Sequence, residues 1–139
     1  MLNLEPLAAL AANEMAGHQP DNANDAENII TKSLGVLAEQ GLYAFGLFLA
    51  TRKRQQDKDA ADRIHTHVRQ LLQTAQLVNV DQLRATDMPT FYKSLTTAQA
   101  KESQVDALRR ILLTKQLLET TLTYGRYAAK ALHISGQLQ

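Results

Sequence analysis

The segment His65-Thr66-His67 comes closest to a metal-binding pattern in this sequence. On a helix, side chains two positions apart point about 200° away from each other, so these two imidazoles cannot bind one ion. Asp62 and His65 have a spacing that could share an ion, but a helical di-iron centre needs two such carboxylate-x-x-His pairs and two further glutamates. The chain also lacks cysteine, which excludes thiolate metal sites and thiol catalysis. We therefore expect neither a metal nor another cofactor.

Motifs for catalysis are equally absent from the sequence. There is no glycine-rich phosphate loop of the GxxxxGK(S/T) or GxGxxG type and no GxSxG nucleophile motif. The aspartates at positions 57–62 are interleaved with Lys58 and followed by Arg63, a pattern typical of an exposed face with ion pairs. His18 and His133 have no nucleophile beside them in the sequence. We expect no catalytic residue and no enzymatic activity.

Basic side chains are grouped in two parts of the sequence. They suit a sugar-phosphate backbone, because phosphate contacts need positive charge and no base-specific geometry. The candidates for nucleic-acid binding are Arg52, Lys53, Arg54, Arg109, Arg126 and Lys130. Tyr124 and Tyr127 lie beside the last two of these cations. They could stack on bases, although packing is the more frequent role of such residues.

The net charge of +1 hides an asymmetry along the chain. Residues 1–31 contain five acidic side chains and no basic one, whereas residues 32–139 carry all 15 basic side chains against nine acidic ones. A basic body of this kind indicates a polyanionic partner such as nucleic acid. The excess is small, however, and an ordinary solvated surface behind an acidic N-terminal segment is the alternative interpretation.

The elements that must carry these residues are expected to be helices throughout. Apolar residues recur at helical spacing, and no stretch alternates with a period of two for long enough to predict a strand. The content of 6 glycines and 3 prolines also argues against a β-rich fold. We predict an all-α, single-domain helical bundle of five to seven helices with a long C-terminal helix. Residues 1–23 form an acidic N-terminal helix and linker, and residues 24–139 form the bundle domain.

Local signals suggest where the helices begin and end. Asn24 and Glu27 match a capping box, which predicts a helix that starts there and stops at Gly41. The next helices are expected over residues 42–58 and 60–77.

The long C-terminal helix is expected from Thr96 or Thr97 to about His133, after a short helix capped by Asp87. A stripe of apolar residues at helical spacing should face the core. The expected core positions are Val105, Leu108, Ile111, Leu112, Leu118, Leu122, Tyr124 and Leu132.

No segment predicts a membrane partner. A transmembrane helix needs about 20 consecutive apolar residues, and the longest apolar run, residues 41–50, is soon followed by Arg52. The first 15 residues hold Glu5 and Glu14 but no Lys or Arg, so they lack the basic start of a secretion signal. We expect a cytoplasmic protein.

Two segments of the sequence are similar to a known family. They are LAEQGLYAFGLFL at residues 37–49 and LLETTLTYGRYAAKAL at residues 117–132. Together with the size and the helicity of the chain, they resemble the small α-helical subunit of type III (Cmr-type) CRISPR–Cas effector complexes. The resemblance covers about residues 25–133, and the acidic residues 1–23 lie outside it.

This resemblance implies a non-catalytic structural role in an RNA-guided complex. Small subunits of that family stack on copies of themselves into a short filament beside the other effector subunits, which hold the guide RNA. Their basic face contacts the guide RNA and target RNA through phosphates, while other subunits perform the cleavage. In that family, residues such as the six candidate cations line the nucleic-acid face.

Two other hypotheses remain open from the sequence. The chain could be a helical protein–protein adaptor without nucleic-acid binding, in which the basic groups meet acidic protein surfaces. It could also be a small helical enzyme or metal carrier, although no motif supports that hypothesis.

Overall fold

The computed structural model describes residues 3–137, and all regular secondary structure in that range is helical. Seven helices follow one another along the chain: α1 (Glu5–Ala16), α2 (Pro20–Gln40), α3 (Leu42–Ala50), α4 (Gln55–Thr74), α5 (Val80–Leu83), α6 (Met88–Leu95) and α7 (Gln104–Gln137). The prediction of an all-α bundle with a long C-terminal helix is therefore confirmed.

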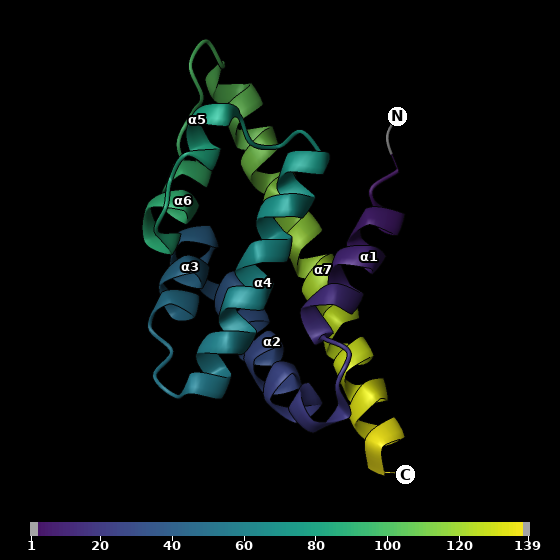
Figure 1. Ribbon diagram of the computed structural model, residues 1–139. Coiled ribbons are helices and arrows are strands. Elements are labelled where there is room, and N and C mark those ends of the chain that lie inside the picture. The colour runs from purple at the N-terminus through teal and green to yellow at the C-terminus, as the bar shows by residue number, and fades with distance from the viewer. Residues whose placement is uncertain (1–2, 138–139) are drawn as a thin grey trace.

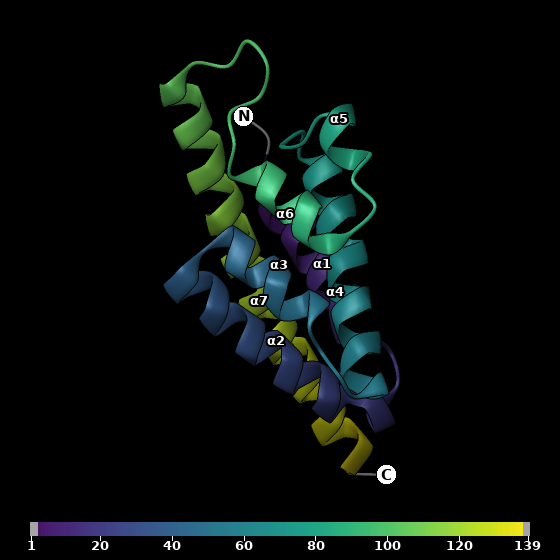
Figure 2. The same ribbon diagram turned by 90° about the vertical axis from the view of Figure 1, so that its left-hand side faces the viewer.

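Four helices, α1, α2, α4 and α7, form the main bundle. Helix α7 packs against both α1 and α2, and α4 packs against the same two helices on the other side. Helices α1 and α7 run in one direction and α2 and α4 in the other (Figure 1). Helices α3 and α6 pack on each other and cover one flank of this bundle, next to the short α5 (Figure 2).

The core joins the apolar faces of these helices into one cluster. An aromatic group holds the flanking helices in place, because the Tyr92 ring of α6 contacts Phe45 of α3 and Phe91 in edge-on geometry, with centroids 5.3 and 5.1 Å apart. The largest fully buried side chains are Met15, Ile30, Leu37, Phe45, Ile64, Val68, Leu72, Phe91, Tyr92, Leu95, Leu118 and Leu122.

The beginning of α2 differs from the prediction. The helix starts at Pro20, because a proline at the first helical position removes only an N–H group that has no partner within the helix. Asn24 therefore lies inside α2, and the prediction that it caps the helix is wrong. The domain boundary expected after residue 23 also falls inside α2, and α1 packs against α7, α4 and α2 as part of the same bundle.

The helix predicted over residues 42–58 is interrupted between α3 and α4. Two side chains occupy the carbonyl oxygens that the end of α3 leaves free. The Thr51 hydroxyl donates to the Leu47 oxygen at 2.8 Å, and Nε of Arg52 donates to the Phe48 oxygen at 2.8 Å. Such bonds satisfy the last carbonyls of a helix. The basic run Arg52-Lys53-Arg54 therefore lies in the connection between α3 and α4.

Helix α7 begins later than predicted, because residues 96–103 form an irregular connection fastened by Arg110. The guanidinium of Arg110 is buried and donates to the Thr97 oxygen at 2.7 Å and the Leu95 oxygen at 3.3 Å. It also pairs with the Glu102 carboxylate at 3.0 Å, and this hydrogen bond lowers the pKa of Glu102. The first turns of α7 are thereby tied to the end of α6.

The N-terminal turns of α7 extend beyond α2 and α1 (Figure 2). Lys115 bonds to the Ala38 oxygen, so α2 ends near that level of α7. Val105, Leu108 and Leu112 lie upstream and are 57–59% exposed, and their prediction as core positions is wrong. The periodicity of the sequence identified this apolar stripe, but no helix among the described residues covers it.

Gly46 marks the closest approach of α3 to α6 and offers a test of the packing. A methyl group added there would lie 2.6 Å from Cβ and Cδ2 of the fully buried Tyr92. We expect Gly46→Ala to lower the free energy of unfolding by about 1–3 kcal/mol through overpacking, as measured by urea denaturation followed by circular dichroism.

Gly35 of α2 is the matched control, because an added methyl group there meets nothing within 4 Å. Gly35→Ala should raise the free energy of unfolding by up to about 1 kcal/mol, since alanine has the higher helix propensity. Equal effects of the two substitutions would contradict the described contact between α3 and α6.

Candidate nucleic-acid interface

Five basic side chains are bound to carbonyl oxygens at the ends of five different helices. A helix leaves its last four carbonyl groups without partners within the helix, and its C-terminal end favours positive charge. The bonds run from Arg63 to Met15 of α1, from Lys115 to Ala38 of α2, from Arg52 to Phe48 of α3, from Arg69 to Leu83 and Ala85 at the end of α5, and from Arg110 to Leu95 of α6. These cations have structural roles.

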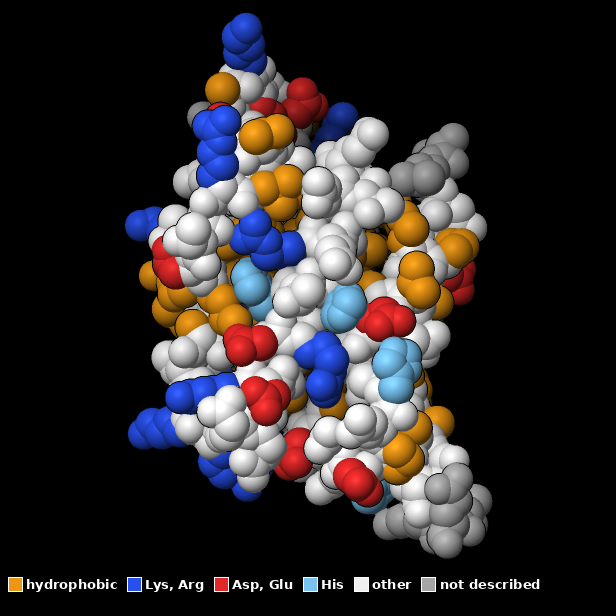
Figure 3. Space-filling model, viewed as in Figure 1, with side chains coloured by type: hydrophobic (Ala, Val, Ile, Leu, Met, Phe, Trp, Pro, Cys, Tyr) orange, Lys and Arg blue, Asp and Glu red, His pale blue; other side chains and the backbone are white. Residues whose placement is uncertain are grey.

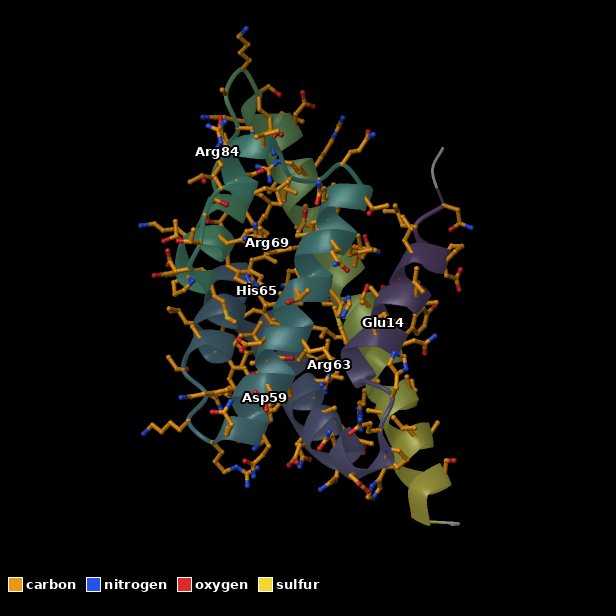
Figure 4. All side chains as sticks on the ribbon, viewed as in Figure 1. Glu14, Asp59, Arg63, His65, Arg69 and Arg84 are labelled. Carbon is orange, nitrogen blue, oxygen red and sulfur yellow. The ribbon has the colours of Figure 1, made fainter. Side chains whose placement is uncertain are left out.

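Two of these arginines project from opposite sides of α4. Figure 4 shows Arg63 on the side toward α1 and Arg69 on the side toward α5 and α6. Nε of Arg63 lies 3.0 Å from the Met15 oxygen, and Nη1 of Arg69 lies 2.8 Å from the Ala85 oxygen. Helix α4 therefore fastens the ends of α1 and α5 through charged side chains.

The basic run between α3 and α4 is partly engaged within the protein. Arg52 stacks over the Phe48 ring, with the guanidinium carbon 3.7 Å from the ring centroid. Arg54 binds both oxygens of Asp57 at 2.9 and 3.1 Å and lies 3.5 Å from Asp25 of α2. The hydrogen bond from Arg54 lowers the pKa of the Asp57 carboxyl. Lys53 is exposed and has no such partner among the described residues.

The candidate cations of α7 are exposed, and among the described side chains none of them has a hydrogen-bond or ion-pair partner. Arg126 and Lys130 are four residues apart, which places them side by side on the helix. Arg109 lies seventeen residues before Arg126, about 25 Å along the axis and about 100° around it. The structure brings Arg126 and Lys130 together and leaves Arg109 apart.

The basic run and the Arg126–Lys130 pair flank the same half of α2. Gly125 and Gly136 of α7 pack next to Ile30 and Pro20, so the C-terminal half of α7 lies along the N-terminal half of α2. Arg54 reaches Asp25 in that half from the α4 side. Residues 120–137 of α7 contain no acidic residue, so no carboxylate of this segment neutralises Arg126 or Lys130.

The face formed by α4 and α1 has a different character. Figure 3 shows Lys and Arg side chains there alternating with Asp, Glu and His side chains. No region of one charge extends over this face in the view, so it offers a poor track for a polyanion.

His65, which belongs to both metal-like spacings, is engaged in the interior. Its Nδ1 is hydrogen-bonded to the Tyr92 hydroxyl at 3.0 Å, and its ring packs edge-on to Phe91 with centroids 5.6 Å apart. Burial, with a contribution from the charge of Arg69, lowers the pKa of His65 to about 4. Among the residues that the structure describes, no group of three His, Asp or Glu side chains is placed to hold a metal ion.

An open groove of about 750 Å³ lies between α1 and α7. Glu5 and Tyr124 are the titratable side chains that line it, and they bind each other, because the Tyr124 hydroxyl donates to Oε1 of Glu5 at 3.1 Å. This hydrogen bond raises the pKa of Tyr124. Most other lining residues are apolar or carry neutral amide and hydroxyl groups.

The structure separates the two tyrosines that the sequence left undecided. Tyr124 faces α1 and is partly buried, whereas Tyr127 is 63% exposed beside Arg126. Leu117, Tyr124 and Ala128 are seven and four residues apart and therefore share one face of α7. Tyr127 lies outside this face. Helical spacing could therefore have identified Tyr127 as the free aromatic residue.

No helix in the described part of the chain combines the length and the apolar character needed to cross a membrane. Comparisons with protein-family models, with curated proteins and with solved structures found no significant match for this chain.

The buried His65 predicts a specific pH dependence of stability. The folded protein binds a proton at His65 only near pH 4, whereas an unfolded histidine binds one near pH 6.5. The contribution of the neutral His65 ring to the free energy of unfolding is therefore fully present above pH 6.5 and is lost as the pH drops from 6.5 to 4. The loss should be smaller than the roughly 3 kcal/mol of a fully buried group, because the ring is partly exposed. The carboxyl groups of Asp57, Asp87 and Glu102 also have a lowered pKa, and their contributions to stability are lost at lower pH than that of His65.

Urea denaturation at several pH values checks this expectation. His65→Gln should flatten the profile between pH 6.5 and 4, because the amide can still bond to Tyr92 and does not titrate. Tyr92→Phe should destabilise the protein but keep the slope, because burial is the main cause of the lowered His65 pKa. A wild-type slope in His65→Gln would show that another group controls this pH range.

Proposed function

We propose that this protein is a non-catalytic structural subunit of an RNA-guided effector complex of the type III CRISPR–Cas kind. In this proposal the surface around Arg126 and Lys130 contacts phosphates of the guide RNA or the target RNA. The observation that carries the proposal is the pair of exposed cations one turn apart, without partners among the described side chains, on a segment free of acidic residues. The same segment, residues 117–132, carries the family resemblance.

The number of free cations suits weak binding by one copy. A phosphate contact gains affinity by releasing counterions, so binding scales with the number of cations that reach the backbone. Arg126, Lys130 and Lys53 are available without breaking any internal bond, whereas Arg54 would have to leave Asp57. A few contacts per copy become strong binding when several linked copies lie along one strand.

Charge reversal tests the proposed interface. The double variant Arg126→Glu/Lys130→Glu should bind a fluorescent RNA at least about tenfold more weakly in an anisotropy titration at low salt. The plot of log affinity against log salt should also lose about 1.4 units of slope, because about 0.7 units belong to each single-strand phosphate contact.

A variant with the same change of charge elsewhere provides the control. Lys93 and Lys101 are exposed cations before the other end of α7. Lys93→Glu/Lys101→Glu should retain the RNA affinity of the wild type apart from a small non-local effect. If both double variants lost binding equally, the interaction would depend on net charge and not on this surface.

The second part of the proposal is that copies of this chain associate with one another, as the subunit hypothesis requires. The uncovered stripe Val105, Leu108 and Leu112 is apolar and lies beside the cation Arg109. A groove of about 370 Å³ between α1 and α4 is lined by four apolar and four polar residues, which are Leu7, Leu10, Ala11, Leu71, Glu14, His67, Gln70 and Thr74.

We propose that the stripe of one copy docks into the α1–α4 groove of the next. In this contact the apolar stripe meets the leucines of the groove, and Arg109 faces the Glu14 carboxylate. Because the two surfaces differ, this contact does not close on itself and generates a linear stack. Self-association without RNA binding would favour the adaptor hypothesis instead.

Complementary variants test the stack in sedimentation velocity. Leu108→Asp should damage the stripe and Leu10→Asp the groove, and each variant alone should be monomeric at concentrations at which the wild type forms longer species. Both residues are exposed, so helicity should not change. An equimolar mixture should form dimers and nothing longer, because each variant retains one intact surface.

Val80→Asp, at another exposed apolar residue, should behave as the wild type. A monomeric wild type at all concentrations, or assembly of the single variants into long species, would contradict the proposed stack.

A further inference from the structure

We infer that Tyr127 is a stacking platform for an unpaired base, and therefore that the RNA at this part of α7 is single-stranded. The inference rests on the proposed function and specifies the form of RNA that the Arg126–Lys130 surface takes. The observation behind it is the 63% exposure of a large aromatic side chain between two cations that have no partners among the described side chains.

The spacing on α7 joins the aromatic ring to the positive charge. Tyr127 and Lys130 are three residues apart and Arg126 and Lys130 four apart, so their Cβ atoms are separated by about 5–6 Å. One nucleotide could thus place its base on the Tyr127 ring and its phosphate near Lys130 or Arg126. Proteins that bind single strands combine aromatic stacking with a positively charged track in this way.

A duplex could not use this arrangement. Its bases are stacked on each other, and the deep, narrow major groove of A-form RNA excludes side chains. A duplex would therefore contact the cations through phosphates and leave the tyrosine ring without a partner. The ring distinguishes the two forms of RNA, whereas Arg126 and Lys130 serve both.

The other tyrosines show why Tyr127 is the residue to assign. Tyr124 donates its hydroxyl to Glu5 and lines the α1–α7 groove, and Tyr92 is fully buried. Tyr43 is exposed on α3, but the nearest charged residue one turn away is Glu39, and no Lys or Arg lies within one turn. Of the four tyrosines, Tyr127 alone combines exposure with adjacent cations.

The experiment compares single-stranded and duplex RNA of equal length in anisotropy titrations at one fixed salt concentration. Tyr127→Ala should weaken binding of the single strand about tenfold and leave duplex binding unchanged. Tyr127→Phe should keep the affinity of the wild type, since stacking needs the ring and not the hydroxyl. Tyr43→Ala is the matched control for removing an exposed tyrosine and should change neither affinity.

The salt dependence separates stacking from charge. Tyr127→Ala should retain the salt slope of the wild type, whereas Arg126→Glu/Lys130→Glu should lower it for both forms of RNA. Equal affinity of Tyr127→Ala and the wild type for single-stranded RNA would overturn the inference and leave the proposed function standing. Absence of RNA binding by the wild type would overturn both.

Discussion

The carbonyl oxygens at the helix ends are the constraint on which the arrangement of this protein depends. The seven helices within residues 3–137 create many such ends, and each end buried against a neighbour needs a donor. Basic side chains from other elements supply donors at five of them, as the bond from Arg63 to Met15 and the bonds from Arg110 to Leu95 and Thr97 illustrate. These bonds fix both the end of one helix and its position against the next.

This use of arginine and lysine determines which charges remain for a partner. Arg52 counts toward the basic composition of the chain but serves α3, and Arg54 is paired with Asp57 and Asp25. Among the described side chains, Arg126 and Lys130 remain without partners on the segment of α7 that has no acidic residue. The length of α7 gives its two ends different surfaces, with an apolar stripe at the N-terminal end and cations with Tyr127 at the other.

The parts of the candidate site that could be predicted from the sequence are those that depend on spacing within one helix. The adjacency of Arg126 and Lys130 follows from a spacing of four on one helix. The separation of Arg109 also follows from helical geometry, once its seventeen-residue distance from Arg126 is converted into a rotation. In contrast, the contact of His65 with Tyr92, twenty-seven residues later, has no local signal, and it explains why a metal-like pattern serves the core instead.

The sequence by itself determined the helical class, the stop at Gly41, the cap at Asp87 and the long last helix, because these depend on periodicity and on hydrogen bonds within a few residues. Only the tertiary structure decided that Val105, Leu108 and Leu112 are uncovered, and which cations bind helix ends. The local sequence does not identify the partner of an apolar stripe or of a charged residue, because burial and pairing depend on where distant helices begin, end and cross.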